Sequence, residues 1–571
     1  MVILGLSGIG HDAAAALLVD GEVVAAVEEE RITRIKNAWT FPVFSVNEAL
    51  SIAGLKTTQI DRICFYWNDK DNLFGAIRNE LKYFFNPKMP SFARIKNRFR
   101  AVHMQKAVVN TIKKEFFSDE SFLPKIEFID HHLSHIAYAF FCSGFESAAG
   151  LIVDGRGEYS SISAYNCVAN KFNKVFGVNM PNSLGFIYAA VTQHLGFAPL
   201  SDEYRVMGLA SYGEENKKLD NFFDALIKTN KIPKIEVDLQ YCNFQNTENL
   251  KEKWLSHKSY DFLGEPRSEE QELNSYHANI AFALQKKIEN VIFELTNYLY
   301  TLVPNKNIVL GGGVAMNSVC NGKISLKSPF ENIFIPPAPS DQGCAIGAAL
   351  YSYNKNNNSN QYIKKNRTPY LGREYSDQQI LEILKSYKIS YVRPTNLMQS
   401  VAELIASGKI CGLFQQRMEF GSRALGNRSI LADPRNKEMK DKINVAIKFR
   451  EKFRPFAATL LDEHSKYYIE NYVSSPYMSF VTRVTAEKRD LIPAVVHIDG
   501  TCRFQTLRKK DNPFYYAIIE EFYKLTNIPL VLNTSFNIKG EPIVMSPTDA
   551  IRCFYSTGLD YLVIGSYILA K

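Results

Sequence analysis

Short apolar runs and glycine turns alternate along residues 1–353. Residues 3–7, 13–19 and 23–28 are three apolar runs in close succession, and they predict a strand, a turn and two more strands. Two later runs, residues 150–153 and 307–310, each lead into a glycine-rich turn. Strands that end in glycine loops before helical segments are typical of α/β folds, so we expect an α/β core with ligands at the strand ends.

A polar stretch without hydrophobic pattern follows this part of the chain. Residues 354–367 are rich in asparagine and predict a linker. We therefore predict a first domain over residues 1–353 and a second domain over residues 368–571. The pattern of the second domain is also α/β, and arginines concentrate in it between residues 417 and 454.

Size and composition favour a globular enzyme. At 571 residues the chain is long enough for two or three domains. It contains no run of about 18 apolar residues, which a membrane span requires, and its first residues predict a strand and not a signal peptide. Nine dispersed cysteines without a CxxC pair argue against a disulfide framework and a thiolate zinc site. We expect a cytoplasmic protein.

The charge pattern gives little reason to expect a nucleic-acid or membrane partner. The net charge of +8 is mild for this length. One basic run, Lys82 to Lys106, has aromatic residues between its lysines and arginines. Such a run could dock an anionic molecule or a membrane surface, but a solvated helical face is the more common explanation. We assign this run no function.

Two histidines and two carboxylates are candidates for a metal site. His131 and His135 are four residues apart and share one face if the segment is helical. A pair of buried or capping histidines would explain this spacing equally well. Asp154 and Asp341, however, each stand where an apolar segment meets glycine. Two imidazoles and two carboxylates form a mixed nitrogen and oxygen site that suits Fe(II), Mn(II) or Zn(II).

Two glycine turns are candidates for ligand binding. Gly311, Gly312 and Gly313 follow a buried strand and precede Asn317, and such a turn lets a nucleotide approach the backbone closely. An ordinary turn also needs glycine. The first turn of the chain carries His11, which titrates near neutral pH and could activate a hydroxyl. A histidine that only contacts the acceptor or the loop explains the pattern nearly as well.

Arginines beside glycine and proline mark the second domain as a candidate anion site. Guanidinium groups match phosphate oxygens in pairs, and amide and hydroxyl side chains can hold a small amide-like group next to them. The candidates are Arg423, Arg428, Arg450, Arg454 and Arg503, with Asn533 and Ser535. Buried ion pairs with Glu419, Asp433 and Glu451 would account for one or two of the arginines but less easily for five.

The joint order of these motifs resembles the NodU/CmcH (TobZ-like) family of O-carbamoyltransferases along nearly the whole chain. Each motif alone is modest, and the ordered set is specific. The shared elements are His-Asp at 11–12, Glu-Glu-Glu-Arg at 28–31, His-His-x-x-His at 131–135, Val-Asp-Gly at 153–155, Val-Met-Gly-Leu-Ala at 206–210, Gly-Gly-Gly-Val-Ala-Met-Asn at 311–317, Arg-Ala-Leu-Gly-Asn-Arg-Ser at 423–429, Phe-Arg-Pro-Phe at 453–456 and Asn-Thr-Ser-Phe-Asn at 533–537.

The resemblance implies a fold and a two-step reaction. The first domain should resemble the actin-like (ASKHA) fold of TsaD proteins, and the second should resemble YrdC. The second domain would bind carbamoyl phosphate and ATP with Mg²⁺ and make carbamoyl-adenylate. In the first domain, a hydroxyl of a small-molecule acceptor would then attack the carbamoyl carbon. The resemblance also implies a homodimer, and it does not identify the acceptor.

The resemblance also assigns roles to residues of this chain. His131, His135, Asp154 and Asp341 match the family's iron ligands. Arg450, Arg454, Arg503, Asn533 and Ser535 match its pocket for carbamoyl phosphate and nucleotide, and His11 matches a residue at the acceptor. We add Arg423, Gly311, Gly312, Gly313 and Asn317 as nucleotide contacts. One departure is Glu203-Tyr204-Arg205, where Glu-Gly-Lys is expected.

Other functions share parts of this pattern. A small-molecule kinase of the ASKHA class would share the first fold but would not need the metal residues or the second domain's arginines. A threonylcarbamoyl transferase that modifies tRNA would share the metal residues, but the mild charge and the second domain argue against it. HypF is related, and its paired CxxC motifs are absent here. A binding protein for carbamoyl phosphate would keep the arginines and not need His11.

Overall fold

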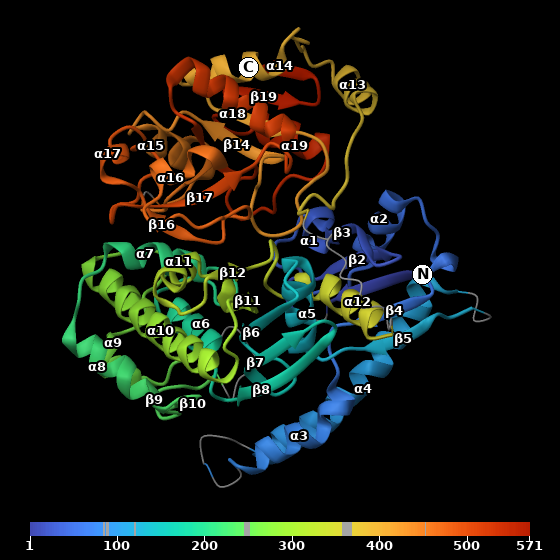
Figure 1. Ribbon diagram of the computed structural model, residues 1–571, viewed down its shortest axis with the longest axis vertical. Helices are drawn as coiled ribbons and strands as arrows, with labels where there is room; N and C mark the ends of the chain where they lie inside the picture. The colour runs from blue at the N-terminus through green and yellow to red at the C-terminus, as the bar shows by residue number, and fades with distance from the viewer. Residues whose placement is uncertain are drawn as a thin grey trace.

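The computed structural model describes residues 1–8, 10–83, 86, 91–118, 122–244, 252–356, 368–451 and 453–571. Residues 357–367 of the expected linker, and most side chains of the basic run from Lys82 to Lys106, lie outside the described residues. We call the described residues up to 356 the N-terminal part and those from 368 the C-terminal part. In Figure 1 the C-terminal part lies above the two sheets of the N-terminal part.

The first sheet of the N-terminal part has five strands in the order β3-β2-β1-β4-β5. Its strands are β1 (Val2–Ser7), β2 (Ala14–Val19), β3 (Glu22–Glu28), β4 (Arg62–Phe65) and β5 (Lys125–Phe128). β1, β2 and β3 form an antiparallel meander, and β4 and β5 continue it in parallel with β1. The three strands expected at the start of the chain are therefore confirmed.

The second sheet repeats this topology. Its strand order is β12-β11-β6-β7-β8, in which β6, β7 and β8 form the antiparallel meander and β11 and β12 run parallel to β6. The strands are β6 (Ser147–Val153), β7 (Ser160–Val168), β8 (Lys171–Asn179), β11 (Asn307–Gly311) and β12 (Asn332–Phe334). A short hairpin, β9 (Ile227–Lys231) with β10 (Lys234–Val237), stands apart.

Two helices lie between the two sheets, and each packs on a different sheet. α12 (Gly343–Asn356) packs on β1 and β2 of the first sheet, and α5 (His131–Ser143) packs on β6 and β11 of the second. The other helices are α1 (Glu29–Thr33), α2 (Val43–Ala53), α3 (Asp69–Leu81), α4 (Ser91–Phe116), α6 (Leu184–His194), α7 (Glu203–Leu209), α8 (Lys217–Leu226), α9 (Tyr260–Leu263), α10 (Ser275–Leu302) and α11 (Ser318–Lys327), with short 3-10 turns η1 (Thr57–Gln59), η2 (Ala210–Tyr212), η3 (His257–Ser259) and η4 (Gly313–Met316).

The C-terminal part is built on one mixed sheet of eight strands in the order β16-β17-β15-β18-β14-β13-β19-β20. An α/β class is thereby confirmed for both parts. The strands are β13 (Cys411–Phe414), β14 (Arg428–Ala432), β15 (Ala457–Leu461), β16 (Val481–Arg483), β17 (Thr501–Leu507), β18 (Leu530–Ser535), β19 (Tyr561–Ile564) and β20 (Tyr567–Ala570). The helices are α13 (Asp377–Ser386), α14 (Leu397–Ala406), α15 (Met439–Ile443), the π-helix η5 (Asn444–Lys448), the 3-10 turn η6 (Asp462–His464), α16 (Ser465–Tyr468), α17 (Ala486–Arg489), α18 (Pro513–Thr526) and α19 (Pro547–Tyr555).

Each sheet has its own apolar core. All nine cysteines are buried within these cores, and each has a free thiol. Among the described residues, no helix combines the length and the apolar character that crossing a membrane would require.

Close packing of α12 against α5 depends on Gly347. A Cβ atom at this position would lie 1.8 Å from the carbonyl oxygen of Ser134, so α5 could not keep its place. We expect Gly347→Ala to lower the free energy of unfolding by about 1–3 kcal/mol, as overpacking usually does, in chemical denaturation. Gly208→Ala in α7 is the matched control, since its Cβ would meet its nearest neighbour at 3.6 Å. Equal effects of the two substitutions would show that the helix contact is not tight.

Candidate active site

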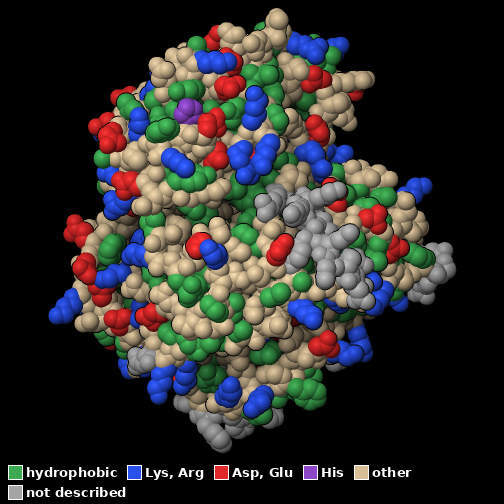
Figure 2. Space-filling model, in the orientation of Figure 1, with side chains coloured by type: hydrophobic (Ala, Val, Ile, Leu, Met, Phe, Trp, Pro, Cys, Tyr) green, Lys and Arg blue, Asp and Glu red, His purple; other side chains and the backbone are tan. Residues whose placement is uncertain are grey.

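One cavity of about 1900 Å³ is lined by residues of both parts of the chain. Figure 2 shows basic side chains on the C-terminal part close to its junction with the N-terminal part. Among the residues selected from the sequence, the cavity wall includes His11, Asp154, Gly313, Asn317, Asp341, Arg423, Arg450, Arg454, Arg503, Asn533 and Ser535. The acidic members and His11 belong to the N-terminal part, and all four arginines belong to the C-terminal part.

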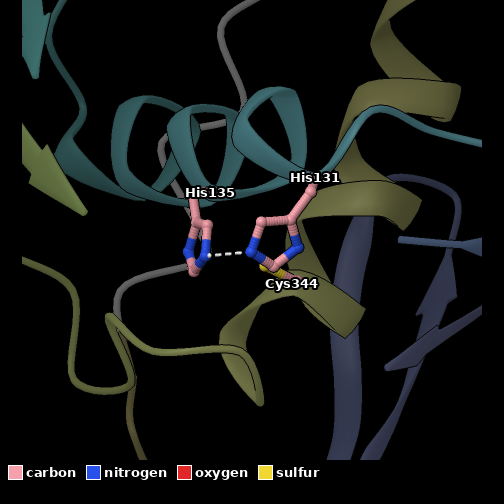
Figure 3. Close-up of side chains that lie close together, drawn as sticks. All are labelled: His131, His135 and Cys344. Atoms are coloured by element: carbon pink, nitrogen blue, oxygen red, sulfur yellow. Dashed lines mark hydrogen bonds between the residues drawn. The ribbon is translucent and has the colours of Figure 1, made fainter. Parts of the chain in front are cut away.

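His131 and His135 lie on one face of α5, as their spacing predicted. The helix begins at His131, and the Asp130 side chain caps it by accepting the Leu133 N–H at 3.0 Å. Both histidines are buried, and their Nε2 atoms are 3.2 Å apart (Figure 3). Two nitrogen ligands about 2.1 Å from one ion lie roughly 3.0–3.4 Å apart at ordinary coordination angles. The pair therefore fits a single ion.

Two carboxylates complete this cluster. Asp154 directly follows β6, and Asp341 lies just before α12, so the helices between the two sheets and the end of β6 meet here. His131 Nε2 is 3.0 Å from Asp154 Oδ2 and 3.7 Å from Asp341 Oδ1. His135 Nε2 is 3.8 Å and 3.7 Å from the same two atoms. The four side chains have ligand atoms within 4.8 Å of one another, and all are buried.

The charges in the cluster support each other. Burial opposes protonation of His131, but Asp341 and Asp154 outweigh it and raise the pKa of this imidazole to about 9. Burial also opposes ionisation of Asp154, and the neighbouring His131 and His135 outweigh it, so the pKa of this carboxyl lies well below its usual range. The two carboxylates thus favour positive charge at His131, and a divalent cation at this place would be stabilised by the same carboxylates.

Cys344 is a further neighbour that the sequence did not bring to attention. Its sulfur lies near both histidines, as Figure 3 shows, and these three residues also meet the spacing of a metal site. Burial, reinforced by the charges of Asp341 and Asp154, raises the pKa of the Cys344 thiol far above its ordinary value. The thiolate is the metal-binding form, so this environment favours the two carboxylates as the remaining ligands.

The glycine turn at 311–313 positions Asp154. The Gly313 N–H donates to Asp154 Oδ1 at 2.8 Å, which leaves Oδ2 facing His131. Gly312 has a φ of +86°, and a Cβ there would lie 2.3 Å from the Val153 carbonyl oxygen. Gly313 and Asn317 line the cavity, whereas Gly311 and Gly312 are not among its wall residues. Asn317 is held by its amide N–H, which donates to Gln285 at 2.9 Å.

His11 lies on the cavity wall and is tethered by its neighbour Asp12. His11 Nδ1 is 3.2 Å from Asp12 Oδ2, and the Ser340 hydroxyl donates to the same oxygen at 3.2 Å. Burial opposes protonation, but Asp341 and Asp12 outweigh it and raise the pKa of His11 to about 10. The Trp39 ring stands edge-on to the imidazole with 6.0 Å between centroids. This tether fixes the orientation of the imidazole.

The arginines at the other end of the cavity mostly lack counter-charges. Within the described part of the chain, no Asp or Glu oxygen is placed within 4.0 Å of a nitrogen of Arg423, Arg450 or Arg503, while Arg454 reaches Glu451 at 3.9 Å. Burial lowers the pKa of Arg503 and Arg450, and repulsion between the arginines lowers it further. Unpaired charge of this kind is costly to bury, so an anionic ligand would stabilise it.

Lys448 and Asn537 belong to the same end of the cavity, and our candidate set omitted both. The Lys448 ammonium donates to the side-chain oxygen of Asn537 at 2.8 Å and to the Ser535 hydroxyl at 3.3 Å. These contacts fix the turn after β18. Asn533, also on β18, is fully buried and donates to Thr459 Oγ1 at 2.9 Å. Lys448 is two residues before Arg450 in the sequence, and this proximity is the signal that could have identified it.

Arg428 has a structural role. Its side chain is fully buried, donates to the Asn427 carbonyl at 2.9 Å and lies over the Phe414 ring at 3.7 Å.

The three acidic residues that could have paired with the candidate arginines mostly have other partners. Glu419 accepts backbone N–H groups of Leu425, Asn427 and Arg428, and Asp433 pairs with Arg435. Glu451 pairs with Arg205 and lies near Arg454.

Comparison with known proteins gives matches over most of the chain. The family model for the carbamoyltransferase N-terminus matches residues 2–350, and the one for the carbamoyltransferase C-terminus matches residues 402–571. The uncharacterized protein sll1178 of Synechocystis sp. is 37% identical over 100% of this chain and 96% of its own length. Nodulation protein NolNO of Sinorhizobium fredii is 35% identical over 98% of this chain and 79% of its own length.

The chain is also weakly similar to solved structures. Component A of (R)-2-hydroxyglutaryl-CoA dehydratase from Acidaminococcus fermentans is 16% identical, with a TM-score of 0.32 over 62% of this chain and 98% of that protein. A TM-score at this level supports no conclusion about function.

The geometry predicts one divalent ion per chain at the histidine and aspartate cluster. We expect His131→Ala to weaken metal binding at least about 100-fold, because a ligand is lost, as measured by metal analysis after dialysis. His132→Gln is the matched control, since this buried neighbour faces Ser163, 2.7 Å from its Nδ1. Equal metal content in His131→Ala and wild type would rule the cluster out as the binding site.

Proposed function

The chain belongs to the carbamoyltransferase family and is a transferase, and from this we propose that it is an ATP-dependent O-carbamoyltransferase. In this proposal it makes carbamoyl-adenylate from carbamoyl phosphate and ATP, and it passes the carbamoyl group to a hydroxyl of a small molecule. One observation carries the proposal: a single cavity joins a cationic end, where few charges are paired, to a histidine and carboxylate cluster.

The first half-reaction belongs at the cationic end. Water would cleave carbamoyl phosphate to carbamate and phosphate, and a carbamate oxygen would then attack the α-phosphorus of Mg²⁺-bound ATP. Carbamoyl-adenylate forms as the bond to pyrophosphate breaks. Arg450, Arg454 and Arg503 would hold the phosphate charges, and Asn533 and Ser535 the carbamoyl group. Fixed positive groups in a closed site stabilise the charge that develops during phosphoryl transfer.

The second half-reaction belongs at the N-terminal end of the same cavity. The acceptor hydroxyl would attack the carbamoyl carbon, form the new carbon–oxygen bond and expel AMP. His131, His135, Asp154 and Asp341 would hold a divalent ion, which supplies Lewis acidity toward the adenylate phosphate. Gly313 keeps Asp154 in place, and His11, oriented by Asp12, would contact the acceptor hydroxyl. Asn317 and Arg423 would contact the nucleotide.

The fold agrees with this division of labour. We propose that the duplicated five-stranded topology of the N-terminal part is an actin-like fold, and that the C-terminal part is YrdC-like. In both repeats the first strand ends at the cavity, since β1 leads to His11 and Asp12 and β6 leads to Asp154. Because both ends belong to one cavity, the labile adenylate would not have to leave it between the two steps.

The first half-reaction can be tested without knowing the acceptor. Protein incubated with ATP, Mg²⁺ and carbamoyl phosphate should release pyrophosphate and form carbamoyl-adenylate, detected by mass spectrometry. We expect Arg503→Ala to lower kcat/KM by about 100-fold or more, because a phosphate contact is lost. Arg435→Ala is the matched control, since Arg435 pairs with Asp433 and is not among the cavity's wall residues.

The products separate this proposal from its rivals. Formation of ADP instead of pyrophosphate would indicate a kinase. Folded, metal-loaded protein that forms neither product would contradict carbamoyl-adenylate formation and would favour a binding protein.

The acceptor step can be tested separately through His11. We expect His11→Ala to form carbamoyl-adenylate at the wild-type rate but to slow carbamoyl transfer by about 100-fold or more, as loss of a group that contacts the reacting hydroxyl usually does. Transfer would be followed by mass spectrometry with a panel of hydroxylated sugars and natural products. Loss of adenylate formation in His11→Ala would place this residue in the first step, against the proposal.

A further inference from the structure

Helix α7 of the N-terminal part lies against the loop of the C-terminal part that carries two of the cavity's arginines. The loop consists of residues 449–456, of which residue 452 is not described. The Tyr212 hydroxyl, just after α7, donates to the Phe453 carbonyl at 3.3 Å, and the two rings are 6.1 Å apart. A Cβ at Gly208 would be 3.6 Å from Pro455. The loop therefore packs against helix α7 of the N-terminal part as well as against the sheet of the C-terminal part.

An ion pair connects α7 to the loop at the cavity. The Arg205 guanidinium pairs with Glu451, which stands in sequence between Arg450 and Arg454. Asp202 accepts from the same guanidinium at 2.8 Å, and the Phe197 ring lies 4.1 Å beneath it, so the orientation of Arg205 is fixed within its own part. The side chains of Arg205 and Glu451 are 16% and 24% exposed. A partly buried pair interacts more strongly than an exposed one.

The neighbouring residue of α7 contacts one of the arginines directly. The Arg454 guanidinium lies over the Tyr204 ring at 4.7 Å, and Lys36 lies 5.4 Å from the same ring. Glu203, Tyr204 and Arg205 all line the cavity. The first turn of α7 thus contacts the arginine loop in two ways. Arg205 pairs with Glu451, and the Tyr204 ring lies against Arg454.

We propose that α7 completes the anion site of the C-terminal part, with Arg205 as a positioning residue that acts through Glu451 on Arg450 and Arg454. The proposal rests on the function proposed above, because carbamoyl phosphate is the anion concerned. Mutual repulsion favours separation of Arg450 and Arg454, and Glu451 is the carboxylate beside them that can offset it. Arg205 holds that carboxylate in place, so the cationic end is incomplete without the N-terminal part.

A double-mutant cycle on Arg205 and Glu451 tests this inference. Arg205→Ala, Glu451→Gln and the double variant would be compared for KM and kcat in carbamoyl-phosphate-dependent pyrophosphate release. Calorimetric binding of inorganic pyrophosphate gives the same comparison without turnover. Arg373→Ala is the matched control, because Arg373 forms another ion pair between the two parts, with Glu48 at 2.9 Å, and neither residue is among the cavity's wall residues.

We expect Arg205→Ala and Glu451→Gln each to raise KM for carbamoyl phosphate about tenfold, with a smaller effect on kcat. The double variant should be no worse than the more severe single one, since both remove the same interaction. Arg205→Lys should recover part of the loss, and Arg373→Ala should stay within about twofold of wild type.

The inference is overturned if the two substitutions are additive, or if Arg205→Ala behaves like Arg373→Ala. Additivity would mean that Arg205 does not act through Glu451, and behaviour like Arg373→Ala would mean that Arg205 merely helps to hold the two parts together. A different result would count against the proposed function instead: wild-type protein that binds pyrophosphate but releases none from ATP and carbamoyl phosphate. In that case the binding cycle still decides the role of Arg205.

Discussion

One end of the cavity collects arginine side chains with few carboxylates beside them, and the rest of the site is arranged around this constraint. Arg423, Arg450 and Arg503 gather there with Lys448, and in the described part of the chain none of the three arginines has an acidic side chain within 4.0 Å. Burying such charge destabilises a protein unless a ligand neutralises it. The wall is held instead by neutral contacts, such as Asn444, which accepts from Arg450 Nε at 2.7 Å. An anionic substrate is the natural partner of this arrangement.

The opposite end of the cavity carries the carboxylates of the histidine and aspartate cluster, and the duplicated fold explains how they come together. Each five-stranded sheet of the N-terminal part sends its first strand toward the cavity, and α5 and α12 between the sheets bring His131, His135 and Asp341 to the same place. Gly347 allows the two helices to approach, and Gly312 and Gly313 allow β11 to approach Asp154. The cluster is therefore set by helix α5 and by two residues at the ends of β6 and α12. Such preorganisation suits the metal site that we propose here.

Much of this arrangement could be predicted from the sequence. The rest depends on contacts between distant residues, which leave no pattern in the sequence near either residue. The spacing of His131 and His135 predicted their shared face, because helical periodicity is a local property. Their approach to Asp341 spans about two hundred residues of chain. The neighbouring glycine marked Asp341 only as a candidate, and the family resemblance assigned it as a ligand. The docking of Arg205 on Glu451 could not be foreseen, since it joins two parts of the chain and the family pattern has another residue at position 205. The role of Gly312 is likewise one of backbone packing.

In the function proposed here, one chain converts carbamoyl phosphate and ATP into a bound carbamoyl-adenylate before any acceptor is involved. Exchange of radiolabelled pyrophosphate into ATP, measured without an acceptor, tests it most directly because it reports reversal of adenylate formation. We expect label to enter ATP when carbamoyl phosphate is present and not to enter when it is omitted. Absence of exchange from metal-loaded protein, or exchange that is independent of carbamoyl phosphate, would contradict it.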